Sequence, residues 1–231
     1  CPSLPQAAQA NRAWMHRVVR HMAGSGGLRQ FVDIGAGIPT SPNPWDIARQ
    51  VDPSATVVGV DNDPVVLAYA RAHLNGMPLV EGDIHHPGQI LARLDRIVNW
   101  HRPVGLLFIA VLHFVKDTDN PARIVQMFLD RMTPGSMIAI SHICSTGAAS
   151  EAVEQVEQVY ERSTAPGQFR TERQIKQLFC GLPLLEPGLV PVQEWPQASK
   201  DRPPTDVPVL GGVAQVPPPR ATTGTRAGGL R

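Results

Sequence analysis

The sequence predicts an α/β domain built on a doubly wound, mostly parallel sheet. Short apolar segments alternate with helical segments from residue 31 to residue 141, as in parallel βαβ units. Glycine-rich or acidic turns follow the first three apolar segments, at the strand ends where open parallel sheets bind ligands. The 231 residues are 42% hydrophobic and 18% charged, so the chain is long and apolar enough to bury a substantial core.

Five apolar segments are expected to form the parallel strands. They cover residues 31–34, 56–60, 78–80, 104–111 and 137–141. The fourth is almost continuously apolar, which is typical of a strand covered on both faces. Towards the end of the chain prolines become frequent, and only short strands are expected, at residues 189–192 and 207–213.

Helical spacing of apolar residues predicts the helices of the domain. The segments cover residues 6–22, 64–74, 121–132, 151–162 and 171–179. The first is amphipathic, with Arg12 and Arg17 among its polar positions, and a run of glycines stops it. Asp63 and Pro64 suit the N-cap and the first turn of the second helix, and Thr171 suits the N-cap of the last.

Composition excludes several classes of partner. The formal net charge is +1, so no overall field would recruit nucleic acid or an anionic membrane. No apolar run approaches the roughly 18 residues that a membrane span requires. Three widely spaced cysteines form no disulfide framework, which favours the cytoplasm. Because the sequence begins with Cys1 instead of Met, we expect it to be a fragment or a processed chain.

The run D-I-G-A-G at residues 33–37 directly follows the first predicted strand. Glycines here let the backbone approach a ligand and adopt positive φ, and a helix is expected to follow at once. The dinucleotide fingerprint would need glycine or alanine at position 40, where the chain has Thr40, so the sequence disfavours a nicotinamide-dependent oxidoreductase. Asp33 suits the ammonium group of an amino-acid ligand; the alternative is a tight turn in which Asp33 caps the next helix.

Asp61 ends the second strand, 24 positions after Gly37. A carboxylate there can accept both hydroxyls of a ribose. The order of strand, glycine-rich turn, helix, strand and acid is more specific than either motif alone, and it predicts nucleoside binding. Asn62 is a candidate for lining the adenosine pocket, whereas Asp63 is better explained as a helix cap.

Asp83 and Ile84 follow the third strand. There Asp83 is placed to accept an adenine amino group while Ile84 packs on the ring; the alternative is a loop acid that caps the helix after Pro87. His85 and His86 resemble a metal pair, but adjacent side chains diverge and no third ligand is evident, so no metal site is predicted.

His113 lies at the carboxyl end of the fourth strand, in the run A-V-L-H-F at residues 110–114. One interpretation is a residue that lines the pocket or acts as a general base with a pKa near neutrality. The other is a hydrogen-bonded structural histidine behind the pocket. His142 carries the same ambiguity, so no catalytic residue is assigned and His113 is the candidate.

Together these residues resemble the class I S-adenosylmethionine-dependent methyltransferases. More narrowly, they are similar to the actinobacterial S-adenosyl methyltransferase family, formerly a domain of unknown function. The matching stretches are residues 11–12, 30–40, 60–68, 110–115, 134–136 and 141–142. The resemblance implies a Rossmann-like fold with helices on both faces of a seven-stranded sheet whose last two strands form a hairpin.

The resemblance also implies the cofactor, S-adenosylmethionine, and the residues around it. They are Arg12, Asp33, Gly35, Ala36, Gly37, Asp61, Asn62, Asp83, Ile84, Ala110 and His113. Arg12 would reach the ligand carboxylate from the first helix; the alternative is a solvated helix charge. Residues 1–27 are expected to form an N-terminal helix and partial lid, residues 28–216 the methyltransferase domain, and residues 217–231 a disordered tail.

The function so implied is methyl transfer to an unidentified small-molecule acceptor. Such transfer depends largely on positioning, so an obvious acid or base is not required. The alternative is a non-catalytic protein that binds S-adenosylmethionine or S-adenosylhomocysteine. No basic stripe or aromatic platform suggests a nucleic-acid acceptor. Residues 144–195 are expected to build the acceptor side, and the oligomeric state is not predicted.

Overall fold

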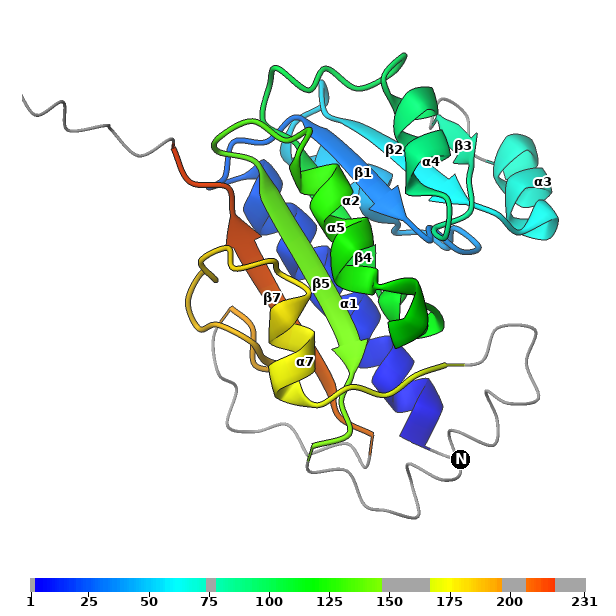
Figure 1. The fold of residues 1–231 in the computed structure, drawn as a ribbon. Helices are drawn as coiled ribbons and strands as arrows, with labels where there is room; N and C mark the ends of the chain where they lie inside the picture. The colour runs from blue at the N-terminus through cyan, green and yellow to red at the C-terminus, as the bar shows by residue number, and fades with distance from the viewer. Residues whose placement is uncertain (1–2, 74–77, 147–166, 197–206, 219–231) are drawn as a thin grey trace, which may run out of the picture.

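One sheet organises the molecule. The computed structural model describes residues 3–73, 78–146, 167–196 and 207–218. The sheet formed by this part of the chain has seven strands in the order β3-β2-β1-β4-β5-β7-β6 (Figure 1). The strands are β1 (Gln30–Ile34), β2 (Thr56–Asp61), β3 (Leu79–Glu81), β4 (Gly105–Ile109), β5 (Met137–Ile143), β6 (Val190–Pro191) and β7 (Val209–Gln215).

The first five strands are parallel, and β7 runs antiparallel to both β5 and β6. This arrangement confirms the predicted doubly wound, mostly parallel sheet that ends in a hairpin. Because β1 and β4 are adjacent although five elements separate them in sequence, the order of the sheet reverses between them. The carboxyl ends on either side of such a switch point form a crevice for ligands.

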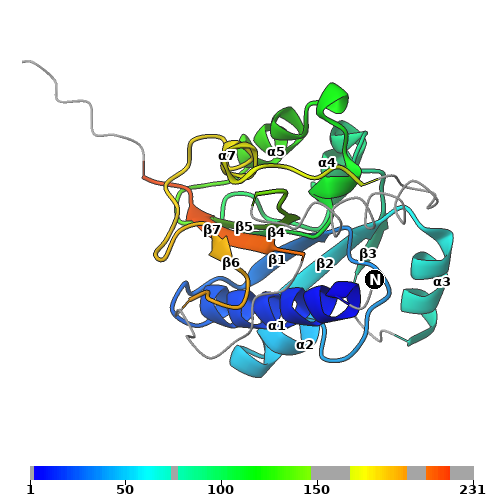
Figure 2. The same ribbon diagram turned by 90° about the horizontal axis from the view of Figure 1, so that it is seen from below.

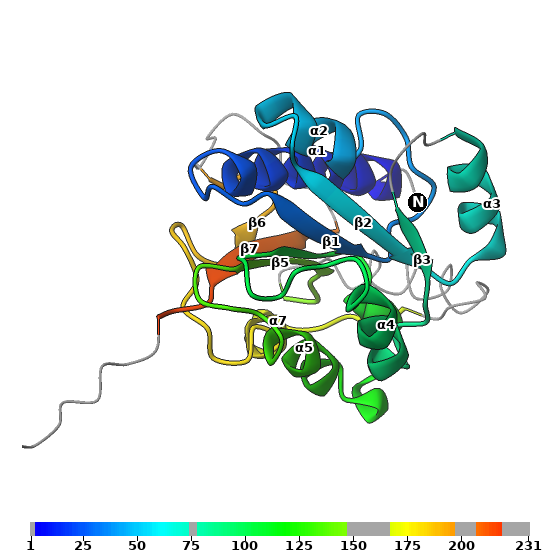
Figure 3. The same cartoon turned by 90° about the horizontal axis from the view of Figure 1, so that it is seen from above.

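Helices cover both faces of the sheet. On one face lie α1 (Ser3–Ala23) and α2 (Pro44–Val51), as Figure 2 shows. The opposite face carries α4 (Pro87–Leu94), α5 (Pro121–Leu129) and α7 (Glu172–Gln177), and α3 (Pro64–His73) lies beside the edge strand β3 (Figure 3). None of the helices in the described ranges is long and apolar enough to cross a membrane.

Strand β4 divides the hydrophobic core into two halves. Leu107 packs into the core beneath α1 and α2, together with Trp14 and Phe31. Leu106 and Phe108 point to the other face, where the Phe108 ring meets Phe128 edge to face, with centroids 5.6 Å apart. Alternate side chains of one strand thus enter both halves, which confirms the prediction of a strand covered on both faces.

The chain leaves the glycine-rich turn by a detour that the sequence did not predict. We expected a helix to follow Gly37 at once, and this expectation is wrong because α2 begins at Pro44. Asn43 sets that start: its side chain accepts from Asp46 N at 3.1 Å, and the Asp46 carboxylate accepts from Asn43 N at 3.0 Å. This reciprocal capping box fixes the first turn of α2 and leaves residues 38–43 as a loop.

Several other predicted elements are shorter or longer than expected. The first helix begins at Ser3, the fifth strand extends to Ile143, and the helix predicted over residues 121–132 ends at Leu129. The fourth strand ends at Ile109 because Ala110 adopts a left-handed φ of 53°. The helix predicted at residues 151–162 and nearly all of the predicted tail lie outside the described residues.

Arg17, one of the polar positions of the first helix, bonds to a distant part of the chain. Its Nε atom donates to the Trp195 carbonyl at 2.8 Å, and Nη2 donates to the Val192 carbonyl at 2.5 Å. Trp195 is itself buried, edge to face with Trp14 at 6.4 Å between centroids. The chain before residue 197 is therefore attached to α1 by both polar and apolar contacts.

Both predicted helix caps are confirmed. The Asp63 carboxylate accepts from Val65 N at 2.7 Å, at the start of α3. Thr171 caps α7 with a second capping box, in which Gln174 is the reciprocal partner. These caps depend on residues three or fewer positions away, which explains why sequence alone was sufficient to find them.

Candidate functional site

The glycine-rich turn after β1 folds back over the end of β2. The backbone N–H groups of Gly35 and Ala36 both donate to the Val60 carbonyl, at 2.8 and 3.1 Å. The N–H group of Gly37 donates to Asp61 Oδ2 at 2.8 Å. Three consecutive amides therefore fasten the turn to β2, and the two predicted ligand-binding motifs are joined by a direct hydrogen bond.

Both glycines of this turn adopt a left-handed backbone. The φ angles are 74° at Gly35 and 61° at Gly37. An alanine Cβ at Gly35 would lie 2.5 Å from Cγ2 of Val111, whereas one at Gly37 would meet no atom within 4 Å. Only a residue without a side chain permits the close approach of the turn to the segment after β4.

Asp61 keeps acceptor capacity after its contacts within the chain are counted. Besides Gly37 N, it accepts from Asp63 N, which lies 2.9 Å from Oδ1. A carboxylate offers about four lone-pair sites. The two backbone donors orient the group, and about two sites remain for the adjacent hydroxyls of a ribose. The geometry therefore suits the role predicted for Asp61.

Asp33 is a buried carboxyl at the end of β1, with 5% of its surface exposed. Burial, and then the negative charge of Asp61, raise the pKa of Asp33 to about 7. A cationic ligand group beside Asp33 would offset both effects, since it would replace the lost hydration and oppose the charge of Asp61. The position therefore suits the ammonium group of an amino acid.

A cavity of about 370 Å³ lies between α1, the glycine-rich turn, the ends of β4 and β5, and the start of β7. It brings together six of the predicted residues, which are Arg12, Asp33, Gly35, Ala36, Ala110 and His113. The other five predicted residues, Gly37, Asp61, Asn62, Asp83 and Ile84, do not line it. The cavity therefore contains the residues predicted to contact the methionine moiety. The residues predicted to contact the nucleoside lie outside it, at the ends of β2 and β3.

Asn11 is a cavity residue that we did not single out from the sequence. It is 9% exposed, and within the described ranges its Oδ1 atom has no hydrogen-bond donor. Such a buried acceptor is costly unless a ligand or water supplies a donor. The signal was present: Asn11 falls between Ala7 and Trp14 on the face that α1 buries, where a polar residue is unexpected.

Asp83 lies beyond β3 and is engaged by its neighbours. Its Oδ1 atom accepts from the backbone N of His85 at 2.9 Å and from the His85 ring at 2.8 Å. Burial raises the pKa of Asp83, but these hydrogen bonds together with the charges of His85 and His86 outweigh it, and the pKa lies below its usual value. Both of these hydrogen bonds to Asp83 Oδ1 come from His85, and neither comes from α4. The alternative, in which Asp83 caps that helix, therefore does not account for them.

His85 is also the residue that first suggested a metal pair. Its ring contacts two carboxylates, Asp83 at 2.8 Å and Asp119 at 3.7 Å. In the described part of the chain, no group of three or more His, Cys, Asp or Glu side chains is placed to hold a metal ion. The His85 ring therefore joins two loops.

His113 lines the cavity, and burial makes its ring a weak base. Its side chain is 3% exposed. Burial, followed by the charges of His142 and Arg170, lowers the pKa of His113 to about 3. The expectation of a pKa near neutrality is therefore wrong, because a buried imidazole beside a fixed guanidinium resists protonation. At physiological pH His113 presents a neutral ring.

Behind His113 lies a polar network centred on Arg170, whose side chain is 1% exposed. Its guanidinium donates to the Leu112 carbonyl at 2.9 Å, to the Val115 carbonyl at 2.7 Å and to Asp117 Oδ1 at 2.8 and 3.0 Å. These contacts hold the turn that carries His113. Sequence gave no signal for the network, since Arg170 lies 53 residues from Asp117 and reads as an ordinary polar residue.

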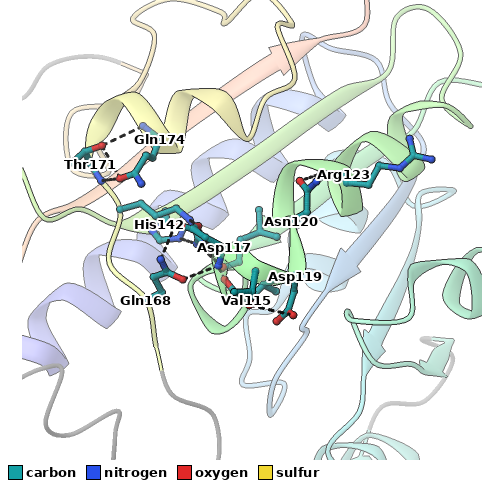
Figure 4. A network of polar contacts seen from close by, with 12 residues as sticks. Val115, Asp117, Asp119, Asn120, Arg123, His142, Gln168, Thr171 and Gln174 are labelled. Atoms are coloured by element: carbon teal, nitrogen blue, oxygen red, sulfur yellow. Dashed lines mark hydrogen bonds and ion pairs between the residues drawn. The ribbon is translucent and has the colours of Figure 1, made fainter.

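His142 completes this network and has a defined tautomer. Its Nε2 atom lies 2.7 Å from Arg170 Nη1 and its Nδ1 atom 2.7 Å from the Ile143 carbonyl. A guanidinium only donates, so Nε2 accepts and Nδ1 carries the hydrogen. Figure 4 shows Gln168 beside Asp117, with its side chain donating to Asp117 Oδ2 at 2.8 Å and His142 close behind. Of the two interpretations offered for His142, a pocket residue or a hydrogen-bonded structural histidine, the network supports the second.

Comparison with a distant solved structure shows which fold this is. Human N-acetylserotonin methyltransferase, solved with S-adenosylmethionine, superposes with a TM-score of 0.50 at 15% identity, covering 93% of this chain and 56% of that one. At this identity the likeness shows the fold alone, which is that of the class I S-adenosylmethionine-dependent methyltransferases. The seven-stranded sheet with its terminal hairpin is the feature they share.

More similar proteins identify the family. A DUF574 family protein from Streptomyces avermitilis is 38% identical, with a TM-score of 0.87 over 94% of this chain and 86% of that one. A Thermobifida fusca protein assigned as a methyltransferase is 29% identical, with a TM-score of 0.86 over 94% and 84%. The family model described as S-adenosyl methyltransferase matches residues 1–217, and the chain belongs to that family. No curated protein matches the sequence.

The residues of the site fit the cofactor of this family, S-adenosylmethionine. The cavity offers a buried carboxyl for an ammonium group, Asp33, and an acceptor, Asn11 Oδ1, to which no described residue donates. It also contains a cation, Arg12, for a carboxylate. Asp61 adds lone pairs for a ribose beside the same turn. The donor and acceptor types therefore match an amino acid joined to a nucleoside.

Proposed function

We propose that this protein transfers the methyl group of S-adenosylmethionine to a small-molecule acceptor. The observation that carries the proposal is the extent of the cavity. It begins at Asp33 and Gly35, and it continues past them between α1 and the ends of β5 and β7, where Leu4, Ile143 and Val209 line it. A protein that only bound the cofactor would need no such space beyond the methionine moiety.

The cofactor-binding roles follow from the chemistry of each residue. Asp33 and Asn11 accept from the ammonium group, and Arg12 binds the carboxylate.

Asp61 accepts from the ribose hydroxyls, with Asn62 beside it on the exposed side of the adenosine. Asp83 accepts from the adenine amino group through Oδ2, which His85 leaves open and the His86 ring approaches to 3.4 Å, and Ile84 packs on the adenine ring. The cofactor contacts the backbone of Gly35, Ala36, Gly37 and Ala110 closely. His113 contributes an uncharged side chain to the wall of the cavity.

Positioning is the main contribution of the chain to catalysis. The chemistry that the bound cofactor supplies is an electrophilic methyl group on a sulfonium sulfur. Methyl transfer is an in-line displacement, so the protein must align the nucleophile and exclude water. With a pKa of about 3, His113 takes no proton from the acceptor at neutral pH. The acceptor proton is therefore released to water after transfer.

The cofactor half of the proposal is tested by calorimetric titration with S-adenosylmethionine. We expect micromolar binding by the natural chain and loss of about tenfold or more in affinity for Asp61→Asn, which removes acceptor capacity from the ribose site. Asp130→Asn is the matched control, because Asp130 lies at the end of α5 and does not line the cavity. Absence of binding by the natural chain would contradict the proposal.

The transfer half is tested with methyl-labelled S-adenosylmethionine and pools of small metabolites. We expect label in one product and release of S-adenosylhomocysteine. Equal affinity for S-adenosylmethionine and S-adenosylhomocysteine, with no transfer to any pool, would favour the non-catalytic binding protein instead. The cytoplasmic location inferred from cysteine usage stays a prediction that fractionation of cells would check.

A further inference from the structure

The cavity has two ends of different chemistry. The end at Asn11, Arg12 and Asp33 is polar and accounts for the amino-acid part of the cofactor. The opposite end is lined by apolar side chains from four separate elements. They are Leu4, Ala7, Phe114, Ile143, Val207 and Val209.

Rigid elements hold this apolar end. Ile143 and Val209 are paired in register on neighbouring antiparallel strands, and both are buried. Leu4 and Ala7 come from the first two turns of α1. Phe114 belongs to the short turn at Leu112–Phe114, which Arg170 holds by its flanking carbonyls. The apolar surface is therefore formed before any ligand arrives, as is usual for small-molecule sites.

Among the described lining residues, charge is confined to the polar end. Of the described residues that line the cavity, Arg12 and Asp33 carry charge, and under the proposed function both are used by the cofactor. His113 is neutral at physiological pH because its pKa is lowered to about 3. An ionised acceptor would lose its hydration at the apolar end and find no counter-ion among these side chains, which is strongly unfavourable.

We infer that the apolar end of the cavity binds the methyl acceptor, and that this acceptor is an uncharged, mainly apolar molecule with one nucleophilic heteroatom. The inference rests on the proposed function. In the transfer, the bond between sulfur and the methyl carbon breaks as the bond between heteroatom and carbon forms. The bonding pair stays on sulfur, and the proton of the heteroatom leaves to water.

Three bicyclic probes of matched shape test the inference. They are neutral 2-naphthol, anionic 2-naphthoate and cationic 2-naphthylmethylammonium, titrated by calorimetry at pH 7. We expect 2-naphthol to bind at least about tenfold more tightly than either ion. Equal or tighter binding of an ion, or binding of none of the three probes, would overturn the inference.

Each titration is run with and without saturating S-adenosylhomocysteine, which separates the two proposals. If S-adenosylhomocysteine fails to bind, the proposed function fails, and the ranking of the probes on the protein alone still decides the inference. If it binds and the ranking is wrong, the inference alone fails.

Two glutamate variants on one helical turn locate the binding. Leu4 lines the apolar end, while Gln6 is exposed on the same turn and does not line the cavity. An acidic residue is tolerated at the start of a helix, so both variants are expected to fold. Leu4→Glu should weaken 2-naphthol binding about tenfold and Gln6→Glu less than about twofold, with S-adenosylhomocysteine binding retained in both. Equal effects of the two variants would show that 2-naphthol binds elsewhere.

Discussion

Replacing Arg170 with methionine removes the guanidinium donors from the buried network behind the cavity while keeping a side chain of similar length. The change leaves two buried acceptors without a partner, the Val115 carbonyl and Nε2 of His142, whereas the Leu112 carbonyl keeps a hydrogen bond from Val115 N at 3.2 Å. Asp117 is half exposed and can be hydrated, so its loss contributes little. The effect of the substitution is therefore set by these two buried acceptors.

Each orphaned buried acceptor destabilises by about 1–3 kcal/mol. Methionine fills part of the vacated volume, so we expect a loss of about 3–5 kcal/mol, the usual range when one partner of a buried ionic network is removed. Urea denaturation followed by circular dichroism measures the loss as a lower midpoint with an unchanged slope. Arg173→Met on the exposed side of α7 is the control and should change stability by less than about 0.5 kcal/mol.

A second measurement on the same variant reports directly on the hydrogen bonds of the network. The charge of Arg170 contributes to lowering the pKa of His142, which is about 4, although burial contributes more. Removing Arg170 should raise the pKa of His142 and release its Nδ1–H tautomer, both visible in nitrogen NMR of the imidazole. A stability loss below about 1 kcal/mol together with an unchanged His142 spectrum would refute our account of the network.

Three further predictions concern protonation and the glycine-rich turn. Between about pH 4 and 6.5 the free energy of unfolding should rise as the pH rises. The slope should be about 1.4 kcal/mol per pH unit for each proton that the unfolded state binds in excess of the folded state. The sign follows because His113 and His142, with pKa values of about 3 and about 4, bind protons in this range only when unfolded. Asp33, with its pKa raised to about 7, binds one proton more when folded and offsets one of the two, and denaturation across pH would check the net rise. Affinity for S-adenosylmethionine should fall up to about tenfold per pH unit below pH 7 in calorimetry, and Asp33→Asn should remove that dependence. Gly35→Ala should destabilise more than Gly37→Ala in urea, by about 1–3 kcal/mol, because only the first places a Cβ against Val111.

Local signals in the sequence predicted the parts of the site that lie at strand ends. Asp33 and Asp61 follow apolar segments of clear length, so parallel pairing of β1 and β2 brings their carboxyl ends to one edge without further information. The caps at Asp63 and Thr171 were predictable for a related reason, since each contacts a residue two or three positions away. The order of the sheet, including its antiparallel end, followed from the resemblance to the family.

Contacts between distant parts of the chain could not be predicted from the sequence. The pKa of His113 depends on how deeply the turn after β4 is buried and on Arg170, which is contributed by a segment more than 50 residues later. The loop at residues 38–43 was missed because the glycine pattern was expected to lead directly into a helix, whereas the capping box of Asn43 starts it later. Asn11 could have been recognised, because it interrupts an apolar helix face.

The hydrogen bonds of the glycine-rich turn bear on which cellular molecules the site rejects. Adenosine is common to many metabolites, and most of the abundant ones carry phosphates next to the ribose. At this turn the amides of Gly35, Ala36 and Gly37 are already donated within the chain, so they cannot cradle a phosphate, and the nearby carboxylate of Asp33 would repel one. The same turn that fastens β1 to β2 therefore gives selectivity against phosphorylated nucleotides.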